Sequence, residues 1–393
     1  MEPAKGVAVD PSIGIEDETD FDPEDSAEDR QTVFVFATDY QSSGQLYAAQ
    51  IEDGVTVLTN SGVTLLGTEA TVRLHEGLLY VLHAGAMFNS VSSDNLQIID
   101  PYDPQHPFKT LNQFSTGNGT NPRDCIIEGN RAFISLYNPG SDPDNIDSNG
   151  DPADVIEMNT NTGEIPHRYS FAAYLNDDGD QNGSAYKMLI VNNTLYVLLQ
   201  DLQSTFTANS NGLVGMIDVN EHHITGTIKM QGRNPSALAA SDDMTRLFVS
   251  HTADYSFNTS YGGIEVINIE AQTTELFIHD SGLGGYVEYL KPSGDKIFAV
   301  LARYDISSFT FESKIVSFPQ DLSDSSAITT FQDYATDIRD IHVHPPYLWA
   351  SYRVISTSEG DANPAIKVFN IETKEQVGET LTPIVAGVSI TGE

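Results

Sequence analysis

Two acidic segments carry the strongest chemical signal in the sequence. The first, Asp178-Gly179-Asp180-Gln181-Asn182-Gly183, fits the start of a calcium-binding loop, D-x-D-x-[DN]-G. In such a loop the alternating oxygens point inward at the ion, and the glycine permits a sharp turn. The Glu that usually closes the loop at position twelve is absent, because Leu189 stands there. Asp177 is a candidate substitute, so the expected ligands are Asp177, Asp178, Asp180 and Asn182.

The second acidic segment lies shortly before the first. Its candidate ligands share short oxygen-bearing side chains and are Asp142, Asp144, Asp147, Asn149 and Asp151. Hard oxygen donors without His or Cys favour calcium over zinc or copper. We expect the two segments to lie side by side and either share one ion or hold two. The alternative is that both are solvated loops, because Asp, Asn, Gly and Pro are also ordinary loop residues.

Other catalytic chemistry has little support. The sequence contains no G-x-S-x-G elbow, no H-E-x-x-H motif and no phosphate-binding loop. Cys125 is the only cysteine, which excludes a disulfide framework and a CxxCH haem attachment within this sequence. We expect Cys125 to be a small buried apolar side chain. These absences favour a non-catalytic protein.

The charge balance restricts the classes of partner. The formal net charge is −37, with 56 acidic residues against only 19 lysines and arginines. This scarcity of bases argues against binding to nucleic acid or to an anionic membrane surface, and it permits cationic partners and metal ions. No run reaches the roughly 18 apolar residues of a membrane helix.

The elements that must position these residues are visible as a repeat. A short apolar run with an aromatic residue at a fixed place occurs seven times, and the aromatic spacings are 46, 53, 63, 52, 50 and 51 residues. A period near this length is typical of one four-stranded blade of a β-propeller. The aromatic residues, which we expect to fill the interfaces between blades, are Phe34, Tyr80, Phe133, Tyr196, Phe248, Phe298 and Trp349.

The two ends of the repeat predict how the ring closes. The first repeat has no inner strand of its own before Val33, whereas the extended run from Ile384 to Thr391 has no blade after it. We therefore predict an all-β, seven-bladed β-propeller over 32–393, closed by the C-terminal strand joining the N-terminal blade. Residues 1–31 are rich in Asp and Glu and have no apolar pattern, so they are predicted to be an acidic disordered tail or linker without a signal peptide.

Loop lengths indicate which rim of the ring is functional. The connections between second and third strands are long, about 84–95, 138–153, 201–212, 252–263, 303–313 and 353–364, and long loops on one rim usually carry function. Arginines that precede or begin inner strands should lie near the channel mouth there as an anion-attracting ring, namely Arg123, Arg233 and Arg339. Polar ends of second strands add the further candidates His83, Tyr137, His251, Arg303 and Arg353. The alternative is that these side chains pair locally with neighbours.

Several of these features resemble a known family. Asn121-Pro122-Arg123-Asp124 opens an inner strand, Leu-Tyr-Val or Leu-Phe-Val follows at Leu79, Leu195 and Leu247, and Gly263 to Asn268 reads Gly-x-x-x-x-Asn. This pattern is similar to the YVTN-type, YncE-like and lactonase-like seven-bladed propellers, although the literal Tyr-Val-Thr-Asn string is absent. The acidic tail resembles the stalk of a bacterial surface lipoprotein. The resemblance implies the fold and carries over no catalytic residue.

Three functions remain open from the sequence. The leading hypothesis is a non-catalytic extracytoplasmic binding or scaffold propeller at the bacterial surface or in the periplasm, either free or anchored by a lipid. Its long-loop rim would hold a protein or ligand, and calcium would stiffen the loops of blades 3 and 4. The second is a calcium-dependent lactonase-like hydrolase acting at the channel mouth. The third is an accessory protein that docks a basic redox partner through its negative field.

Overall fold

The computed structural model describes most of the chain after the N-terminal segment. The described residues are 31–38, 44–52, 54–65, 69–84, 94–175, 182–202, 208, 210–253, 260–305, 310–321, 328–352, 356–357, 360–361, 364–383 and 386–392. The predicted tail at 1–31 therefore lies outside them except for Gln31. Within the described part, no helix is both long and apolar enough to cross a membrane.

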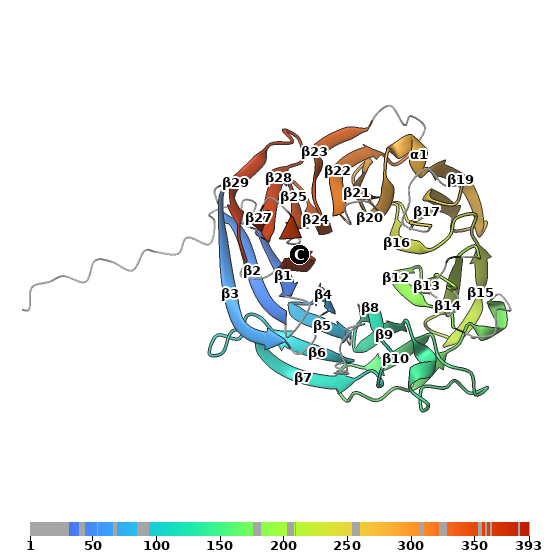
Figure 1. Ribbon diagram of the computed structural model, residues 1–393. Coiled ribbons are helices and arrows are strands. Elements are labelled where there is room, and N and C mark those ends of the chain that lie inside the picture. The colour runs from blue at the N-terminus through green and yellow to red at the C-terminus, as the bar shows by residue number, and fades with distance from the viewer. Residues whose placement is uncertain are drawn as a thin grey trace, which may run out of the picture.

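Seven antiparallel four-stranded sheets form a ring around a central channel, which confirms the predicted seven-bladed β-propeller (Figure 1). From the inner to the outer strand, blades 1 to 4 comprise β30 (Ala386–Gly392), β1 (Gln31–Thr38), β2 (Gly44–Glu52) and β3 (Val55–Leu65); β4 (Glu69–His75), β5 (Leu78–Ala84), β6 (Asn95–Asp100) and β7 (Lys109–Ser115); β8 (Pro122–Glu128), β9 (Arg131–Leu136), β10 (Val155–Asn159) and β11 (His167–Tyr169); and β12 (Ala185–Val191), β13 (Thr194–Leu199), β14 (Leu213–Asp218) and β15 (His223–Lys229).

Blades 5 to 7 repeat the same order. They comprise β16 (Pro235–Ala240), β17 (Arg246–His251), β18 (Gly263–Asn268) and β19 (Thr273–His279); β20 (Tyr286–Ser293), β21 (Lys296–Asp305), β22 (Thr310–Pro319) and β23 (Thr329–Thr336); and β24 (Ile338–His344), β25 (Tyr347–Tyr352), β28 (Ala365–Asn370) and β29 (Gln376–Leu381). A short helix, α1 (Asp280–Leu283), joins blades 5 and 6.

The C-terminal strand closes the ring as predicted. β30 pairs antiparallel with β1, from Val33 opposite Gly392 to Thr38 opposite Ala386. The inner strand of blade 1 thus comes from the end of the chain and the other three strands from its beginning. This arrangement leaves no open junction between the first and last blades.

The aromatic repeat fills the interfaces between blades. The buried side chains fall into seven clusters, each drawn from two neighbouring blades. Each cluster contains one of the seven aromatic residues of the repeat; for example, Phe133 packs between blades 3 and 4 and Trp349 between blades 7 and 1. An aromatic ring buries a large apolar area and therefore holds adjacent wedge-shaped sheets together.

Inner strands carry a bulge near their first residues. The pairing between the inner and second strands shifts by one residue at this place in every blade except blade 2. The bulged residue is Arg123 in blade 3, Ser236 in blade 5, Glu288 in blade 6 and Arg339 in blade 7. A bulge redirects a side chain relative to the alternation of the strand. The side chains of these four residues line the central channel.

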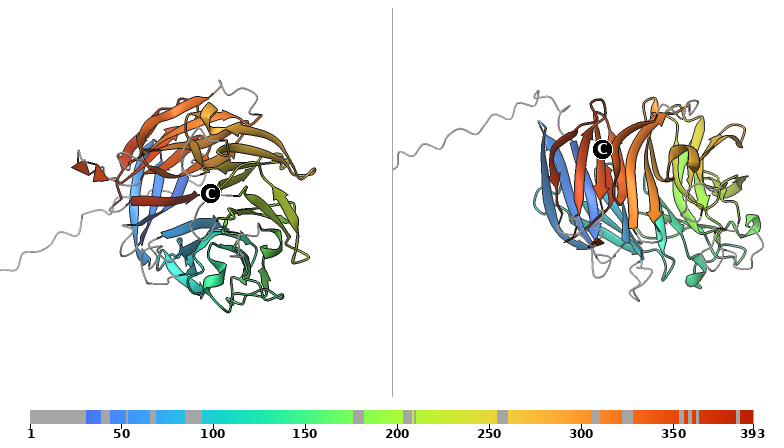
Figure 2. Two further views of the ribbon diagram at one scale, coloured as in Figure 1. Left: turned by 45° about the vertical axis from the view of Figure 1, so that its right-hand side comes forward. Right: turned by 45° about the horizontal axis from the view of Figure 1, so that its top comes forward.

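The prediction of a long connection at 303–313 is wrong. β21 and β22 continue pairing as far as Asp305 opposite Thr310, so most of that segment is strand. In blade 7 the connection between second and third strands contains a small hairpin, β26 (Ser356–Thr357) with β27 (Gly360–Asp361), which stands away from the ring in the left view of Figure 2.

Candidate functional site

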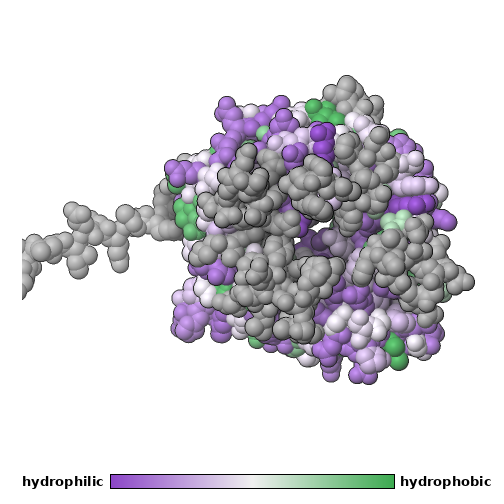
Figure 3. All heavy atoms as spheres, viewed as in Figure 1, coloured by the Kyte–Doolittle hydropathy of each residue, from purple (hydrophilic) through white to green (hydrophobic). Residues whose placement is uncertain are grey.

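The inner strands enclose a cavity of about 680 Å³ in the centre of the ring. All seven inner strands contribute to its wall, for example Arg73 from β4, Ser236 from β16 and Ser389 from β30. Figure 3 shows the opening near the middle of the viewed face, with hydrophilic residues behind it. A volume of this size lies within the range of small-molecule sites.

The wall of this cavity carries more positive than negative charge. Its described basic residues are Arg73, Arg123, Lys187, Lys291 and Arg339. Its described acidic residues are Asp124, Glu288 and Asp340. Five of the chain's 19 lysines and arginines, but only three of its 56 acids, are therefore found here. In a protein of net charge −37 this concentration creates a local attraction for anions.

Asp124 holds three blades together at the cavity wall. Its carboxylate accepts a hydrogen bond from Arg73 of blade 2 at 2.7 Å and one from the amide of Met188 in blade 4 at 3.0 Å. Burial alone would raise the pKa of Asp124, but the charges of Arg73 and Lys187 and these hydrogen bonds lower it. Asp124 therefore remains ionised and fixes the position of Arg73.

A related arrangement stands on the other side of the cavity. Asp340 in β24 accepts hydrogen bonds from its neighbour Ile341 at 2.9 Å and from Ile390 of β30 at 3.1 Å. Burial lowers the pKa of Lys291, the attraction of Asp340 opposes this, and Arg73 and Lys187 lower it further. The three cations therefore repel one another across the cavity, and an anion bound among them would relieve that repulsion.

The sequence-predicted arginines are divided by the structure. Arg123 and Arg339 line the cavity at their bulges, and Arg339 lies 3.5 Å from Asp337. Arg233 is not in the wall: its guanidinium stacks on Tyr261 at 3.7 Å and donates to the carbonyl oxygen of Ala208. The predicted ring of three arginines is thus reduced to two.

Two further candidates are placed beside aromatic rings. Arg303 stacks on Tyr334 at 4.0 Å and donates to the carbonyl oxygen of Gly284 at 2.8 Å, away from the cavity wall. Tyr137 is buried behind the wall with Arg123 over its ring at 5.1 Å. Arg353 lies outside the described residues.

His83 and His251 lie inside the blades and not at the channel mouth, which corrects the expectation for both. Each is fully buried at the end of its second strand. His83 contacts Gln97 of the third strand at 3.0 Å, and burial lowers its pKa to about 4. His251 lies 3.1 Å from the buried Glu265. The polar residue on the neighbouring third strand draws each imidazole inward.

Two carboxylates of the second acidic segment accept hydrogen bonds from nearby backbone amides. Asp142 accepts hydrogen bonds from the amides of Asn118 and Asp144, at 2.8 and 3.0 Å. Asp147 accepts from the amides of Asn149 and Asp151, at 2.8 and 3.1 Å. These contacts stabilise turns, and the calcium assignment stays a prediction.

Of the four expected ligands in the first acidic segment, Asn182 alone is described, and its side-chain oxygen accepts a hydrogen bond from the amide of Ser184 at 2.9 Å. Asp177, Asp178 and Asp180 lie outside the described residues. The buried Asp154, which follows the second acidic segment in the sequence, accepts a hydrogen bond from the amide of Gly183 at 3.0 Å, so the end of the first segment lies next to the residues that follow the second.

Most of the charged cavity wall is not among the residues predicted from the sequence. Arg73, Lys187 and Lys291 stand within predicted inner strands and are flanked by apolar residues. A charge inside an otherwise apolar inner strand was the available signal, because that position must face either a partner or the channel.

Comparisons with known proteins identify the fold. No family model matches the chain, and a search of curated proteins finds no match. Among solved structures, a candidate 6-phosphogluconolactonase of Bacteroides fragilis superposes with a TM-score of 0.63 at 12% identity, covering 95% of this chain and 100% of that chain. One from Bacteroides uniformis gives 0.62 at 12% identity, covering 93% and 100%.

A third similar structure is the periplasmic gluconolactonase of Pseudomonas aeruginosa, with a TM-score of 0.59 at 12% identity, covering 92% of this chain and 99% of that one. Likeness over nearly the whole length of each protein, at an identity this low, concerns the backbone. It establishes that this chain has the fold of these proteins, a seven-bladed β-propeller.

Proposed function

We propose that the central cavity binds a small anionic sugar-derived lactone and that the protein hydrolyses it. The observation that carries the proposal is the positive wall of the cavity in an otherwise strongly acidic chain. A carboxylate or phosphate on the ligand would pair with Lys187, Lys291 and Arg73. The names of the similar structures favour this function over a non-catalytic scaffold, because two are named as candidate 6-phosphogluconolactonases and one as a gluconolactonase.

The chemistry needs a base and a positive group near the ester. In lactone hydrolysis, a base removes a proton from water as the water oxygen attacks the carbonyl carbon. The resulting oxyanion then collapses, and the ring oxygen leaves as an alcohol after taking up a proton. A carboxylate supplies the base, and a cation stabilises the oxyanion.

Glu288 and Arg339 are suited to these two roles. Both are bulged residues in the cavity wall, on the neighbouring inner strands β20 and β24. Burial, and next the charge of Glu288, raise the pKa of Tyr289, while Arg339 lowers it, so both charges act at the same place. Asp124 is less suited to the role of base because Arg73 and two amides occupy its oxygens.

The test is hydrolysis of gluconolactone and of its 6-phosphate, followed by acid release in weak buffer and corrected for spontaneous opening. We expect the wild-type protein to accelerate the reaction, Glu288→Gln to lower kcat by roughly 10²–10⁴-fold, and Arg339→Met to weaken both binding and turnover. The exposed Glu270→Gln is the matched control and should behave as wild type. No acceleration by the wild-type protein would refute the hydrolase.

Binding of these lactones without turnover would instead support the non-catalytic reading, in which the propeller holds a ligand. Titration calorimetry with the hydrolysed sugar acid, which cannot be turned over, measures binding to the cavity independently of turnover. Loss of binding in Lys291→Met with no change in Lys229→Met, an exposed residue outside the cavity, would locate the ligand in the channel.

The remaining parts of the proposal concern location, partners and calcium. The periplasmic gluconolactonase from Pseudomonas aeruginosa supports an extracytoplasmic location for this chain. A protein partner on the long-loop rim, docking of a basic redox partner, a lipid anchor and calcium in the loops of blades 3 and 4 stay predictions. No step of the proposed hydrolysis depends on a metal ion.

A further inference from the structure

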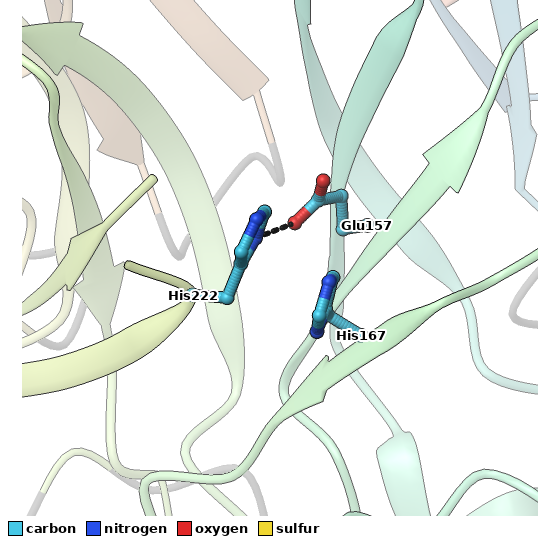
Figure 4. Close-up of side chains that lie close together, drawn as sticks. All are labelled: Glu157, His167 and His222. Carbon is cyan, nitrogen blue, oxygen red and sulfur yellow. Dashed lines mark hydrogen bonds and ion pairs between the residues drawn. The ribbon is translucent and has the colours of Figure 1, made fainter. Parts of the chain in front are cut away.

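A second group of side chains lies between blades 3 and 4, outside the cavity wall. Glu157 projects from β10, His167 from the start of β11, and His222 from the turn between β14 and β15 (Figure 4). One donor atom from each of the three lies within 4.8 Å of the other two. In the described part of the chain this is the one group of three or more His, Cys, Asp or Glu side chains that meets this criterion.

The carboxylate is fixed before any ion arrives. Glu157 is 2% exposed, and its Oε2 accepts a hydrogen bond from Tyr169 at 2.8 Å. Its Oε1 lies 3.6 Å from Arg131, which also donates to the carbonyl oxygen of Val219. Arg131 therefore balances one oxygen of Glu157 and leaves the other directed at His222, whose Nδ1 is 3.0 Å away. A carboxylate held in this way loses little freedom on binding a cation.

The two imidazoles are close and almost parallel. The ring centroids of His167 and His222 are 3.9 Å apart, with planes 10° from parallel. Figure 4 shows the two rings beside Glu157. In a tetrahedral zinc site, bonds of about 2.0–2.1 Å place neighbouring ligand atoms roughly 3.3 Å apart. The Glu157–His222 separation is close to this value already. The rings need only rotate about their terminal side-chain torsions, which are soft, to direct both nitrogens at one point.

We propose that Glu157, His167 and His222 form a binding site for a divalent transition-metal ion that crosslinks blades 3 and 4. Two imidazoles with one carboxylate suit zinc and its neighbours in the first transition row, and do not suit calcium or magnesium. Three protein ligands leave a position for water, and both histidines are partly exposed, so solvent can reach the ion. The site is separate from the proposed lactone site and from the two acidic segments.

The blade repeat supplies a variant that should preserve the fold. His222 adopts φ 53° in its turn, and Gln272 adopts φ 53° in the corresponding turn of blade 5. In both turns the side-chain oxygen of the residue four positions earlier accepts a hydrogen bond from a backbone amide of the turn. Asp218 accepts from Glu221, and Asn268 accepts from Ala271. His222→Gln therefore suits this backbone while removing an imidazole. His223→Gln is the matched control, because His223 is the exposed neighbour outside the cluster.

The experiment uses the full chain without a histidine tag. Binding of Zn²⁺ is measured by equilibrium dialysis at pH 7.5, with Ca²⁺ present in excess to occupy hard-oxygen sites. We expect one saturable Zn²⁺ per chain, a melting temperature that rises with zinc concentration, and at least ~10-fold weaker binding in His222→Gln. His223→Gln should bind as wild type. Co²⁺ substitution should give visible d–d bands that His222→Gln lacks.

Two results would overturn the site. One is the absence of a stoichiometric zinc ion in the wild-type protein. The other is equal binding by His222→Gln and His223→Gln, which would mean that zinc binds elsewhere. If the melting temperature of His222→Gln without metal equals that of wild type, a difference in zinc binding cannot be attributed to unfolding. If that melting temperature falls, His167→Gln provides the second test by the same dialysis.

Discussion

Replacement of Asp124 by Asn tests whether a buried charge holds the cavity wall together. The carboxylate has oxygens for Arg73, for the amide of Cys125 and for the amide of Met188. The amide of Asn offers only one oxygen, so its NH₂ group must face at least one of these donors. Asp124 itself is fully buried, whereas the side chain of Arg73 is 34% exposed. Breaking a fully buried pair costs about 3–5 kcal/mol.

Because Arg73 keeps part of its hydration in the cavity, we expect the lower figure of about 2–3 kcal/mol for this substitution. An unfolding entropy of about 2.1 cal/mol/K per residue gives about 0.8 kcal/mol/K for 393 residues. The melting temperature should therefore fall by about 3–4 °C. The assay is thermal and urea unfolding of Asp124→Asn, Arg73→Met and the double variant.

The double variant separates an ion pair from two independent effects. If Arg73 and Asp124 interact as the structure indicates, the double variant should be about 1–2 kcal/mol more stable than the sum of the single losses predicts. Strict additivity, or an Asp124→Asn protein that melts with wild type, would refute the reasoning. The carboxylate would then be no support for the wall.

Three further predictions concern other parts of the molecule. Burial lowers the pKa of His83 to about 4, so the folded state binds fewer protons than the unfolded state below about pH 6.5. Between pH 7 and 4.5 the wild-type protein should therefore lose roughly 2.5 kcal/mol more stability than His83→Gln. Urea unfolding measures this difference, with the exposed His106→Gln as control. Deletion of residues 384–393 removes the strand that pairs with β1 and should lower the melting temperature by well over 10 °C or abolish folding; a truncated chain that melts like wild type would disprove the closure. Calcium should raise the melting temperature relative to EDTA, because a site at a hundredfold excess of calcium over Kd stabilises the folded state by about 2.7 kcal/mol. The double variant Asp178→Ala/Asp180→Ala should show no such rise. An equal rise in the double variant would reject the assigned loop.

The architecture was readable because it repeats. Apolar runs with one aromatic residue, separated by similar intervals, required a ring of similar sheets, and the run after Ile384 had no other blade to join. The structure bears this out, since each aromatic residue fills one interface and β30 pairs with β1. The connection at 303–313 was misjudged because Asp305, Ser307 and Ser308 are residue types common in loops, although the described residues at both ends of this segment pair in β21 and β22.

The site was less readable because it depends on register. A bulge shifts the alternation of an inner strand by one residue, and nothing in the apolar pattern marks where Glu288 and Arg339 leave it. His83 and His251 were placed at the channel mouth because they end second strands. Their burial depends on Gln97 and Glu265, which are distant in sequence. The cluster of Glu157, His167 and His222 joins two blades and has no linear spacing that a motif could capture.

Because β30 pairs with β1 as an inner strand with a second strand, the packing of the ring does not depend on where the chain begins and ends. The pairing there is of the same kind as that between inner and second strands in the other blades. A circularly permuted chain, with its old ends linked and new ends opened between the inner and second strands of another blade, would rebuild the same seven interfaces with that blade completed by both ends. The ring therefore has a seam whose place can be moved, and the channel enclosed by the inner strands would be unaffected by where that seam lies.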